Sequence, residues 1–214
     1  MFEKARTQGF DLSAKCAVVV GCGGLGTNAA VHLCGMGVGK LILVDFDTVE
    51  AGNLNRQFFY TPADVGRPKC AVLAARLAAY APNCAVTACL ANVERPDSLP
   101  QIAEADVLLC AVDSNAARRA LNDQCAERSI PLVNGGVDGF FGTAYLYIPG
   151  KTPDLERAGL LDAQNEKPRS VSSTVGVIGA LQAQLAAKYL CGETAHAGKL
   201  FIFDNEEIRS LSIQ

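Results

Sequence analysis

Short, continuous apolar runs alternate with stretches of helical periodicity through the first two thirds of the chain. Residues 16–20 (CAVVV) and 41–44 are apolar and rich in branched side chains, which is typical of parallel strands buried on both faces. A glycine turn and an apolar-periodic stretch at residues 25–36 lie between them, and Gly37 and Gly39 end that stretch. This order predicts a βαβ unit with a right-handed crossover.

The same alternation continues further along the chain and then changes character. The further helices that the pattern predicts lie at residues 68–80, 115–128 and 175–190. The further strands are an alternating one at 84–90, a buried one at 106–110, one at 130–133 and an alternating antiparallel one at 143–148. A polar loop at 151–168 and a closing hairpin at 200–203 and 208–213 complete the pattern. We therefore predict one α/β domain over residues 1–214. Its sheet should be Rossmann-like, doubly wound and mainly parallel, extended by C-terminal antiparallel strands.

Composition narrows the class of protein. The chain is 50% hydrophobic and 19% charged with a formal net charge of -3, so no basic excess suggests nucleic-acid binding. Its apolar runs are far shorter than the ~20 residues of a membrane span, and its N-terminus lacks the apolar core of a signal peptide. The nine cysteines are scattered and show no C-x-x-C pair, as expected of buried thiols in a reducing compartment. We expect a cytoplasmic protein that binds no membrane.

A glycine-rich turn provides the first candidate chemistry. Gly21, Gly23 and Gly26 fit the pattern G-x-G-x-x-G between a strand and a helix, and Gly24 removes one more side chain from the same corner. Such a turn lets the backbone and the helix N-terminus approach a phosphate. Asp45 ends the second strand, where a carboxylate can accept hydrogen bonds from ribose hydroxyls. The sequence predicts nucleotide binding without deciding which nucleotide.

The polar segment after Asp45, DFDTVEAGNLNRQFFY, is not needed by a dehydrogenase. Asn53 and Arg56 offer an amide and a planar cation to phosphate oxygens, and Lys69 opens the next predicted helix near the same sheet edge. Asp113 follows another strand at its carboxyl end. Two cations and a carboxylate suit a triphosphate with Mg²⁺, and they do not suit hydride transfer.

Together these motifs resemble the ThiF/MoeB/HesA family, the bacterial relatives of ubiquitin-activating enzymes, and most closely a short ThiF. The similarity runs from CAVVVGCGGLG through LVDFDTVEAGNLNRQ, GRPK and ADVLLCAVDSNAARRALN to FDNEEIRSLSI. The resemblance implies that Arg56, Lys69 and Asp113 are catalytic and that Asp113 binds Mg²⁺ beside Ser114. The predicted nucleotide-binding residues are Gly21, Gly23, Gly24, Gly26, Asp45, Asp47, Asn53, Arg56, Lys69, Asp113 and Ser114.

The resemblance also implies an activity. The family uses ATP and Mg²⁺ to adenylate the C-terminal Gly-Gly carboxylate of a small ubiquitin-like sulfur carrier similar to ThiS or MoaD, with release of pyrophosphate, and its members are typically homodimers. Residues of about 14–135 would bind the nucleotide and about 136–214 would bind the carrier, with the loop at 151–168 as a clamp over the carrier's tail.

The sequence lacks three features of the family. Zinc-binding C-x-x-C pairs of some members are missing, so we predict no zinc. No cysteine lies between Cys125 and Cys191, where ThiF-type members carry a reactive one. Arg6 is too close to Gly21 to match the arginine that the family offers across its dimer. Adenylation of a small carboxylic acid or peptide therefore remains an alternative, as do an inactive nucleotide-binding scaffold and, against NLNRQ and Lys69, a NAD-dependent oxidoreductase.

Overall fold

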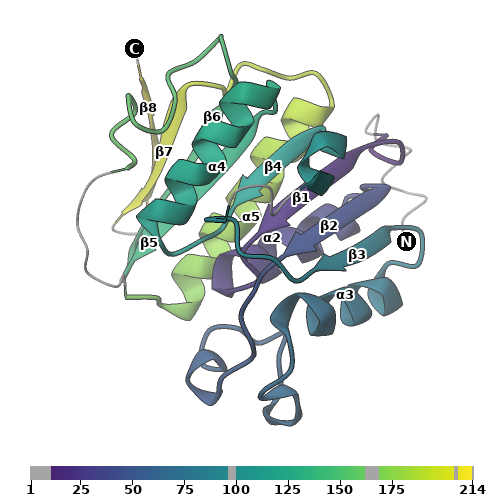
Figure 1. The fold of residues 1–214 in the computed structure, drawn as a ribbon. Helices are drawn as coiled ribbons and strands as arrows, with labels where there is room; N and C mark the ends of the chain where they lie inside the picture. Colours follow the sequence, from purple (N-terminus) through teal and green to yellow (C-terminus); the bar gives the residue numbers. More distant parts are fainter. Residues whose placement is uncertain (1–10, 96–99, 162–168, 205–206, 214) are drawn as a thin grey trace.

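A single eight-stranded sheet organises the chain (Figure 1). The computed structural model describes residues 11–95, 100–161, 169–204 and 207–213. In the sheet order β3-β2-β1-β4-β5-β6-β7-β8, the first five strands pair in parallel and the rest pair antiparallel. The strands are β1 (Cys16–Val20), β2 (Lys40–Val44), β3 (Ala85–Cys89), β4 (Val107–Cys110), β5 (Leu132–Asp138), β6 (Phe141–Tyr147), β7 (Lys199–Asp204) and β8 (Glu207–Ser212).

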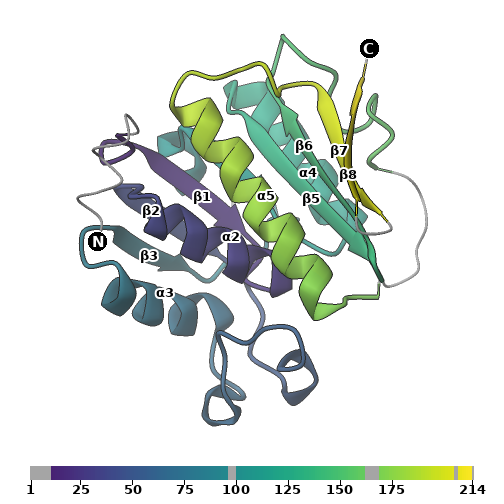
Figure 2. The same cartoon turned by 180° about the vertical axis from the view of Figure 1, so that it is seen from behind.

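Helices cover both faces of the parallel half. The α-helices of the described residues are α2 (Gly24–Gly35), α3 (Lys69–Tyr80), α4 (Asn115–Arg128) and α5 (Ser172–Leu190), and the short 3₁₀ helices are η1 (Ala51–Asn53), η2 (Pro62–Asp64) and η3 (Pro100–Glu104). Helix α4 lies against the face seen in Figure 1, and α2, α3 and α5 lie against the opposite face, seen in Figure 2. The sheet is therefore the middle of three layers.

Burial on two faces explains the continuous apolar runs. Successive side chains of a strand point to opposite faces. Ala17 and Val19 pack in the core that holds α2, α3 and α5, whereas Val18 and Val20 pack with α4. A strand between two helical layers needs apolar side chains on both of its faces, so apolar and polar residues do not alternate along β1.

The chain reverses its direction of travel across the sheet at β1. From β1 it moves outward through β2 to β3, and it then returns to place β4 and β5 on the other side of β1. All five strands are parallel, so their carboxyl ends share one edge. In open α/β sheets the crevice at such a reversal is the usual ligand site.

The predicted fold class is confirmed, with one element longer than expected. Strand β5 continues to Asp138, beyond the predicted end at residue 133. The added residues include Gly135 and Gly136, and glycine inside a strand often marks a close approach of another part of the chain. A Cβ atom at Gly135 would overlap the Gln182 side chain of α5, so this glycine admits a buried helix against the strand.

The predicted loop at 151–168 is described only up to residue 161. Leu155 is fully buried, and its backbone N–H donates to Asn122 Oδ1 of α4 at 3.0 Å. The Tyr145 hydroxyl donates to the Pro153 carbonyl at 2.7 Å. This first part of the loop is therefore packed against β6 and α4, and residues 162–168 lie outside the described residues.

No helix in the described part of the chain combines the length and the apolar character that crossing a membrane requires.

The close contact between the glycine turn and α2 gives a test of stability. A Cβ at Gly26 would overlap the Gly21 carbonyl oxygen, whereas a Cβ at Gly176 of α5 would meet nothing within 4 Å. Gly26→Ala should lower the free energy of unfolding by at least ~1–3 kcal/mol, since the overlap forces the backbone apart. Gly176→Ala should raise it by ~0.5–1 kcal/mol, because alanine is the better helix former.

Urea unfolding followed by circular dichroism measures both variants. Equal effects of the two substitutions would show that the turn and the helix are not in this tight contact.

Candidate active site

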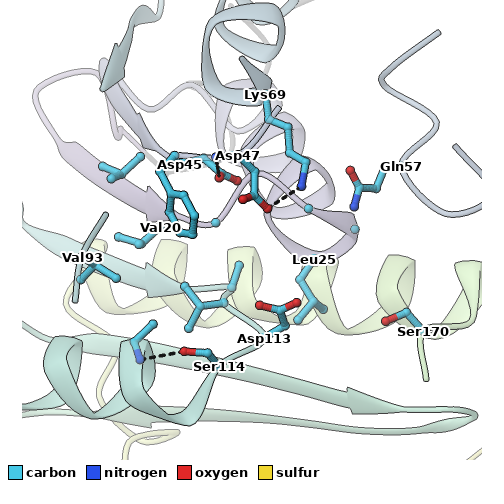
Figure 3. A pocket seen from close by; sticks show the side chains of 18 of the residues that line it. Val20, Leu25, Asp45, Asp47, Gln57, Lys69, Val93, Asp113, Ser114 and Ser170 are labelled. Carbon is cyan, nitrogen blue, oxygen red and sulfur yellow. Dashed lines mark hydrogen bonds and ion pairs between the residues drawn. The ribbon is translucent and has the colours of Figure 1, made fainter. Parts of the chain in front are cut away.

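A cavity of about 380 Å³ opens at the carboxyl edge of the parallel strands (Figure 3). Its walls come from the glycine turn after β1, the segment after β2, the ends of β3 and β4, the start of α4, and the segment before α5. The predicted residues that line it are Gly21, Gly23, Gly24, Asp45, Asp47, Asn53, Arg56, Lys69, Asp113 and Ser114. Segments far apart in the sequence thus meet at the predicted edge.

The glycine turn forms one wall. Gly21 has φ of 93°, and a Cβ there would lie 2.6 Å from the Ala111 carbonyl oxygen, so only glycine fits this corner. Helix α2 begins after Gly23, and no side chain caps it. The first backbone N–H groups of a helix lack intrahelical acceptors, and with the helix dipole they favour an anion.

Gly26, the last glycine of the predicted set, lies behind the turn. It does not belong to the residues that line the cavity. It is buried in the first turn of α2, where the lack of a side chain lets the helix approach the Gly21 carbonyl. Gly26 therefore shapes the turn by packing, and its contact with a nucleotide stays a prediction.

Asp45 joins the glycine turn to the segment after β2. It is 7% exposed, and its two carboxylate oxygens accept hydrogen bonds from the backbone N–H groups of Cys22 (2.6 Å) and Asp47 (2.8 Å). Burial raises the pKa of Asp45, while the N–H donors of Asp47 and Cys22 act in the opposite direction. Each oxygen keeps a second lone pair, so ribose hydroxyls remain possible donors.

Lys69 is held at the cavity wall by Asp47. The lysine is only 6% exposed, and its Nζ lies 2.9 Å from Asp47 Oδ2. Its backbone N–H also donates to the Asp47 carbonyl at 2.9 Å, at the start of α3. The Asp47 side chain is 50% exposed. The buried ammonium is thereby fixed in one position, with the half-exposed carboxylate partly neutralising it.

The segment after β2 carries Arg56 and Asn53 to the cavity. Arg56 Nη1 donates to the carbonyl of Gly52 (3.2 Å) and to Asn55 Oδ1 (2.9 Å). Asn53 Oδ1 accepts from the Glu50 backbone N–H at 3.4 Å, which closes η1. Both side chains therefore have local partners as well as a place in the cavity wall.

Asp64 anchors the base of this segment. Its buried carboxylate accepts from the backbone and hydroxyl of Thr61 and pairs with Arg67 and with Arg76 of α3. Hydrogen bonds from Thr61 first, and also from Arg76, lower the pKa of Asp64 to about 2. The segment that carries Arg56 is thus fastened to α3.

Asp113 lies across the cavity from the Asp47–Lys69 pair (Figure 3). None of the described residues forms a hydrogen bond or ion pair with its carboxylate. Ser114, by contrast, is the N-cap of α4: its Oγ accepts from the Ala117 N–H at 2.9 Å and donates to Glu94 Oε1 at 2.7 Å. The Asp113 carboxylate is therefore available to a ligand, whereas the Ser114 hydroxyl is already hydrogen-bonded to Ala117 and Glu94.

Sequence reasoning missed Gln57, Glu94 and Arg118, which also line the cavity. Arg118 donates to Asn134 Oδ1 at 2.9 Å and to the Val112 carbonyl at 3.1 Å, and so links the residue before Asp113 to strand β5. Gln57 closes the NLNRQ run and could have been found there. Glu94 follows β3, and its place at a strand's carboxyl end was the available signal.

The donor set bears on metal binding. Within residues 11–95, 100–161, 169–204 and 207–213, no group of three or more His, Cys, Asp or Glu side chains could hold a metal ion. A zinc or calcium cage from side chains alone is therefore not formed by these residues. Mg²⁺ is usually bound by one or two carboxylates together with phosphates and water, and Asp113 fits that chemistry.

Comparisons with known proteins point to one family. A sequence model described as the ThiF family matches residues 6–214. The chain is 35% identical over 206 residues to the sulfur carrier protein ThiS adenylyltransferase of Escherichia coli, covering 92% of this chain and 81% of that protein. It is also 35% identical over 210 residues to the molybdopterin-synthase adenylyltransferase of Escherichia coli, covering 92% and 84%.

A solved structure supports the same relationship. The structure of E. coli MccB with ATP has a TM-score of 0.84 and 27% identity, covering 94% of this chain and 64% of that one. The chain thus spans just under two thirds of MccB. Another structure holds MccB, a microcin C7 biosynthetic enzyme, in complex with N-formylated MccA.

The anchoring of Asp64 predicts a pH dependence. Its pKa is lowered to about 2 in the folded protein, against ~3.9 in an unfolded chain, so its stabilising contribution is present above pH ~4 and is lost as the pH falls toward 2. Asp64→Asn should therefore be less stable than the wild type at pH 5, and the difference should shrink steadily between pH 4 and pH 2.

Urea titrations at each pH measure this difference. The control is Glu127→Gln on α4, whose carboxylate is 74% exposed. A difference between Asp64→Asn and the wild type that stayed constant down to pH 2 would contradict the anchoring.

Proposed function

Because the chain belongs to the ThiF family, we propose that it is an ATP- and Mg²⁺-dependent adenylyltransferase. Its substrate is the C-terminal Gly-Gly carboxylate of a small ubiquitin-like sulfur carrier similar to ThiS or MoaD. The products are the acyl-adenylate of the carrier and pyrophosphate. The relatives that act on ThiS and on molybdopterin synthase support this choice.

One observation supports it most strongly: the cavity places a cationic group and a free carboxylate on facing walls. Lys69 is fixed by Asp47 on one wall, and Asp113 lies across from it (Figure 3). Asp45 occupies the end of the cavity beside Val20 and Val93. This order suits a ribose at Asp45 and a polyphosphate between Lys69 and Asp113.

Mg²⁺ would be held by Asp113 and by the phosphate oxygens. When bound, the ion neutralises charge that develops on the polyphosphate. The Asp113 carboxylate orients it on the side of the cavity opposite Lys69. Arg118 supports this by tying Val112, the residue before Asp113, to Asn134 of β5.

The reaction needs positioning more than covalent catalysis. A carboxylate oxygen of the carrier attacks the α-phosphorus, the bond from that phosphorus to the bridging oxygen breaks, and pyrophosphate leaves with the electron pair. Lys69 and Arg56 stabilise the charge that grows on the phosphate oxygens. The N–H groups at the start of α2 provide further donors, and the cavity walls hold the two anions in line.

We assign carrier binding to residues of about 136–214. None of the described helices lies over β7 and β8 in either view (Figures 1 and 2). Leu211 of β8 is 56% exposed and Phe141 of β6 is 44% exposed. Exposed apolar residues on strands without a covering helix suit a protein partner. The clamp predicted at residues 151–168 lies partly outside the described residues and stays a prediction.

Adenylation of a peptide is the second candidate, because MccB has a similar structure and has been solved with ATP and with MccA. The sequence lacks a cysteine between Cys125 and Cys191, so no thiol there accepts an acyl group after adenylation. A peptide acceptor needs no such step. Both candidates share the chemistry at the α-phosphorus and differ only in the acceptor.

We further propose a cytoplasmic homodimer that holds no zinc. All nine cysteines are free thiols, and seven of them are buried, as a reducing compartment would allow. The family resemblance is the basis for the dimer. Arg6, the nearest candidate for a residue offered across it, lies outside the described residues.

ATP–pyrophosphate exchange distinguishes these functions. The wild type should exchange label in the presence of ThiS, and Asp113→Ala should reduce the rate by ~10²- to 10³-fold because charge stabilisation is lost. Glu127→Gln, which changes an exposed carboxylate on α4, should exchange label at the wild-type rate. Circular dichroism checks that both variants are folded.

Other outcomes would correct the proposal. Exchange with MccA but not with ThiS would favour the second candidate. Full exchange by Asp113→Ala would contradict its place at the metal. Binding of ATP with no exchange for either acceptor would indicate a scaffold without catalysis.

A further inference from the structure

Gln57 is a buried polar residue for which the chemistry at the phosphates has no use. Its side chain is 4% exposed and lines the cavity. Its backbone is fixed by hydrogen bonds to Asn53 and from Tyr60, both at 3.0 Å. The residue is therefore held in place, and only its amide group is left to interact with a ligand.

The amide has an unmet hydrogen-bonding capacity. Among the described residues, Gln57 Oε1 is buried and has no hydrogen-bond partner. Gln57 Nε2 lies against the glycine turn, 3.5 Å from the position of a Cβ at Gly23. Buried polar groups in folded proteins are almost always paired, so an unpaired one at a ligand cavity calls for a ligand. The terminal torsion of glutamine is broad, which lets the amide turn to meet it.

The Gln57 amide lies at the end of the cavity away from Asp45, the expected ribose site. In Figure 3, Asp45, Val20 and Val93 lie at one end of the cavity, and Gln57 and Ser170 lie at the other end on opposite sides. Lys69 and Asp113 lie between the two ends. With a ribose at Asp45 and phosphates in the middle, the end with Gln57 and Ser170 is left for the acceptor.

The chemistry of the amide identifies what it binds. Phosphate and carboxylate oxygens only accept hydrogen bonds, so either could pair with Nε2 and would leave Oε1 unpaired. A peptide group offers one donor and one acceptor and can pair with both atoms of the amide. The N–H of a C-terminal residue is also only two bonds from the carboxylate carbon, next to the reacting atoms.

We propose that Gln57 binds the last peptide group of the acceptor, and so selects a carboxylate at the end of a peptide or protein over a small carboxylic acid. This inference rests on the proposed adenylation and adds a specificity-determining residue to it. Ser170, across the cavity, offers a hydroxyl to the same tail.

The test removes the hydrogen bond from each side in turn. ThiS is prepared with its natural C-terminal glycine or with glycolate in its place, which changes the last amide to an ester and removes its N–H. Exchange is measured with both carriers for the wild type, for Gln57→Met, and for a control, Gln184→Met, which makes the same change at an exposed position of α5.

With the wild type and the control, the ester should lower kcat/KM for the carrier by ~10-fold, the effect of one hydrogen bond. Gln57→Met should lower kcat/KM for the amide carrier by a similar factor and show no further loss with the ester. The KM for ATP should stay the same. Should Gln57→Met fail to fold, the wild-type comparison of the two carriers still tests the prediction.

Two results would overturn the role of Gln57. One is a pair of carriers that the hydrogen bond does not distinguish: the wild type shows equal kcat/KM with the amide and the ester carrier, or Gln57→Met loses as much kcat/KM with the ester as the wild type does. The other is a raised KM for ATP with unchanged kinetics for the carrier, which would assign the amide to the phosphates. The lack of any exchange by the wild type with the amide carrier and with MccA alike would instead overturn the proposed adenylation together with this inference.

Discussion

The turn between β1 and α2 is the constraint on which the rest of the site depends. Gly21 passes so close to Ala111, and Gly26 so close to Gly21, that side chains are excluded at both positions. The helix can therefore begin directly at the edge of the sheet, with its first N–H groups at the cavity. The Asp45 carboxylate then bonds to Cys22 in this turn and to Asp47 beyond β2, and Asp47 in turn holds Lys69.

Much of the fold could be predicted because its signals are local. Continuous apolar runs without alternation mark the buried parallel strands, and the glycine turn marks the start of α2. The end of β5 could not be placed, because Gly135 serves a contact with Gln182, which is remote in the sequence. A glycine that admits a distant helix looks the same in a sequence as one that ends a strand.

The site was predictable to a similar depth. Parallel strands bring their carboxyl ends together, so charged residues after β2 and β4 were expected to meet, and the cavity collects them. Their partners could not be predicted, since these depend on geometry between segments. Ser114 caps α4, Arg118 links Val112 to β5, and Gly26 packs against the Gly21 carbonyl, although their residue types fitted ligand binding equally well.

A crystal structure with a non-hydrolysable ATP analogue and Mg²⁺ tests the arrangement most directly. We expect the ribose at Asp45, the polyphosphate between Lys69 and Asp113 with Arg56 turned toward it, and the ion on Asp113. A nucleotide bound outside this cavity, or a polyphosphate from which Arg56 and Lys69 both point away, would contradict the proposed site.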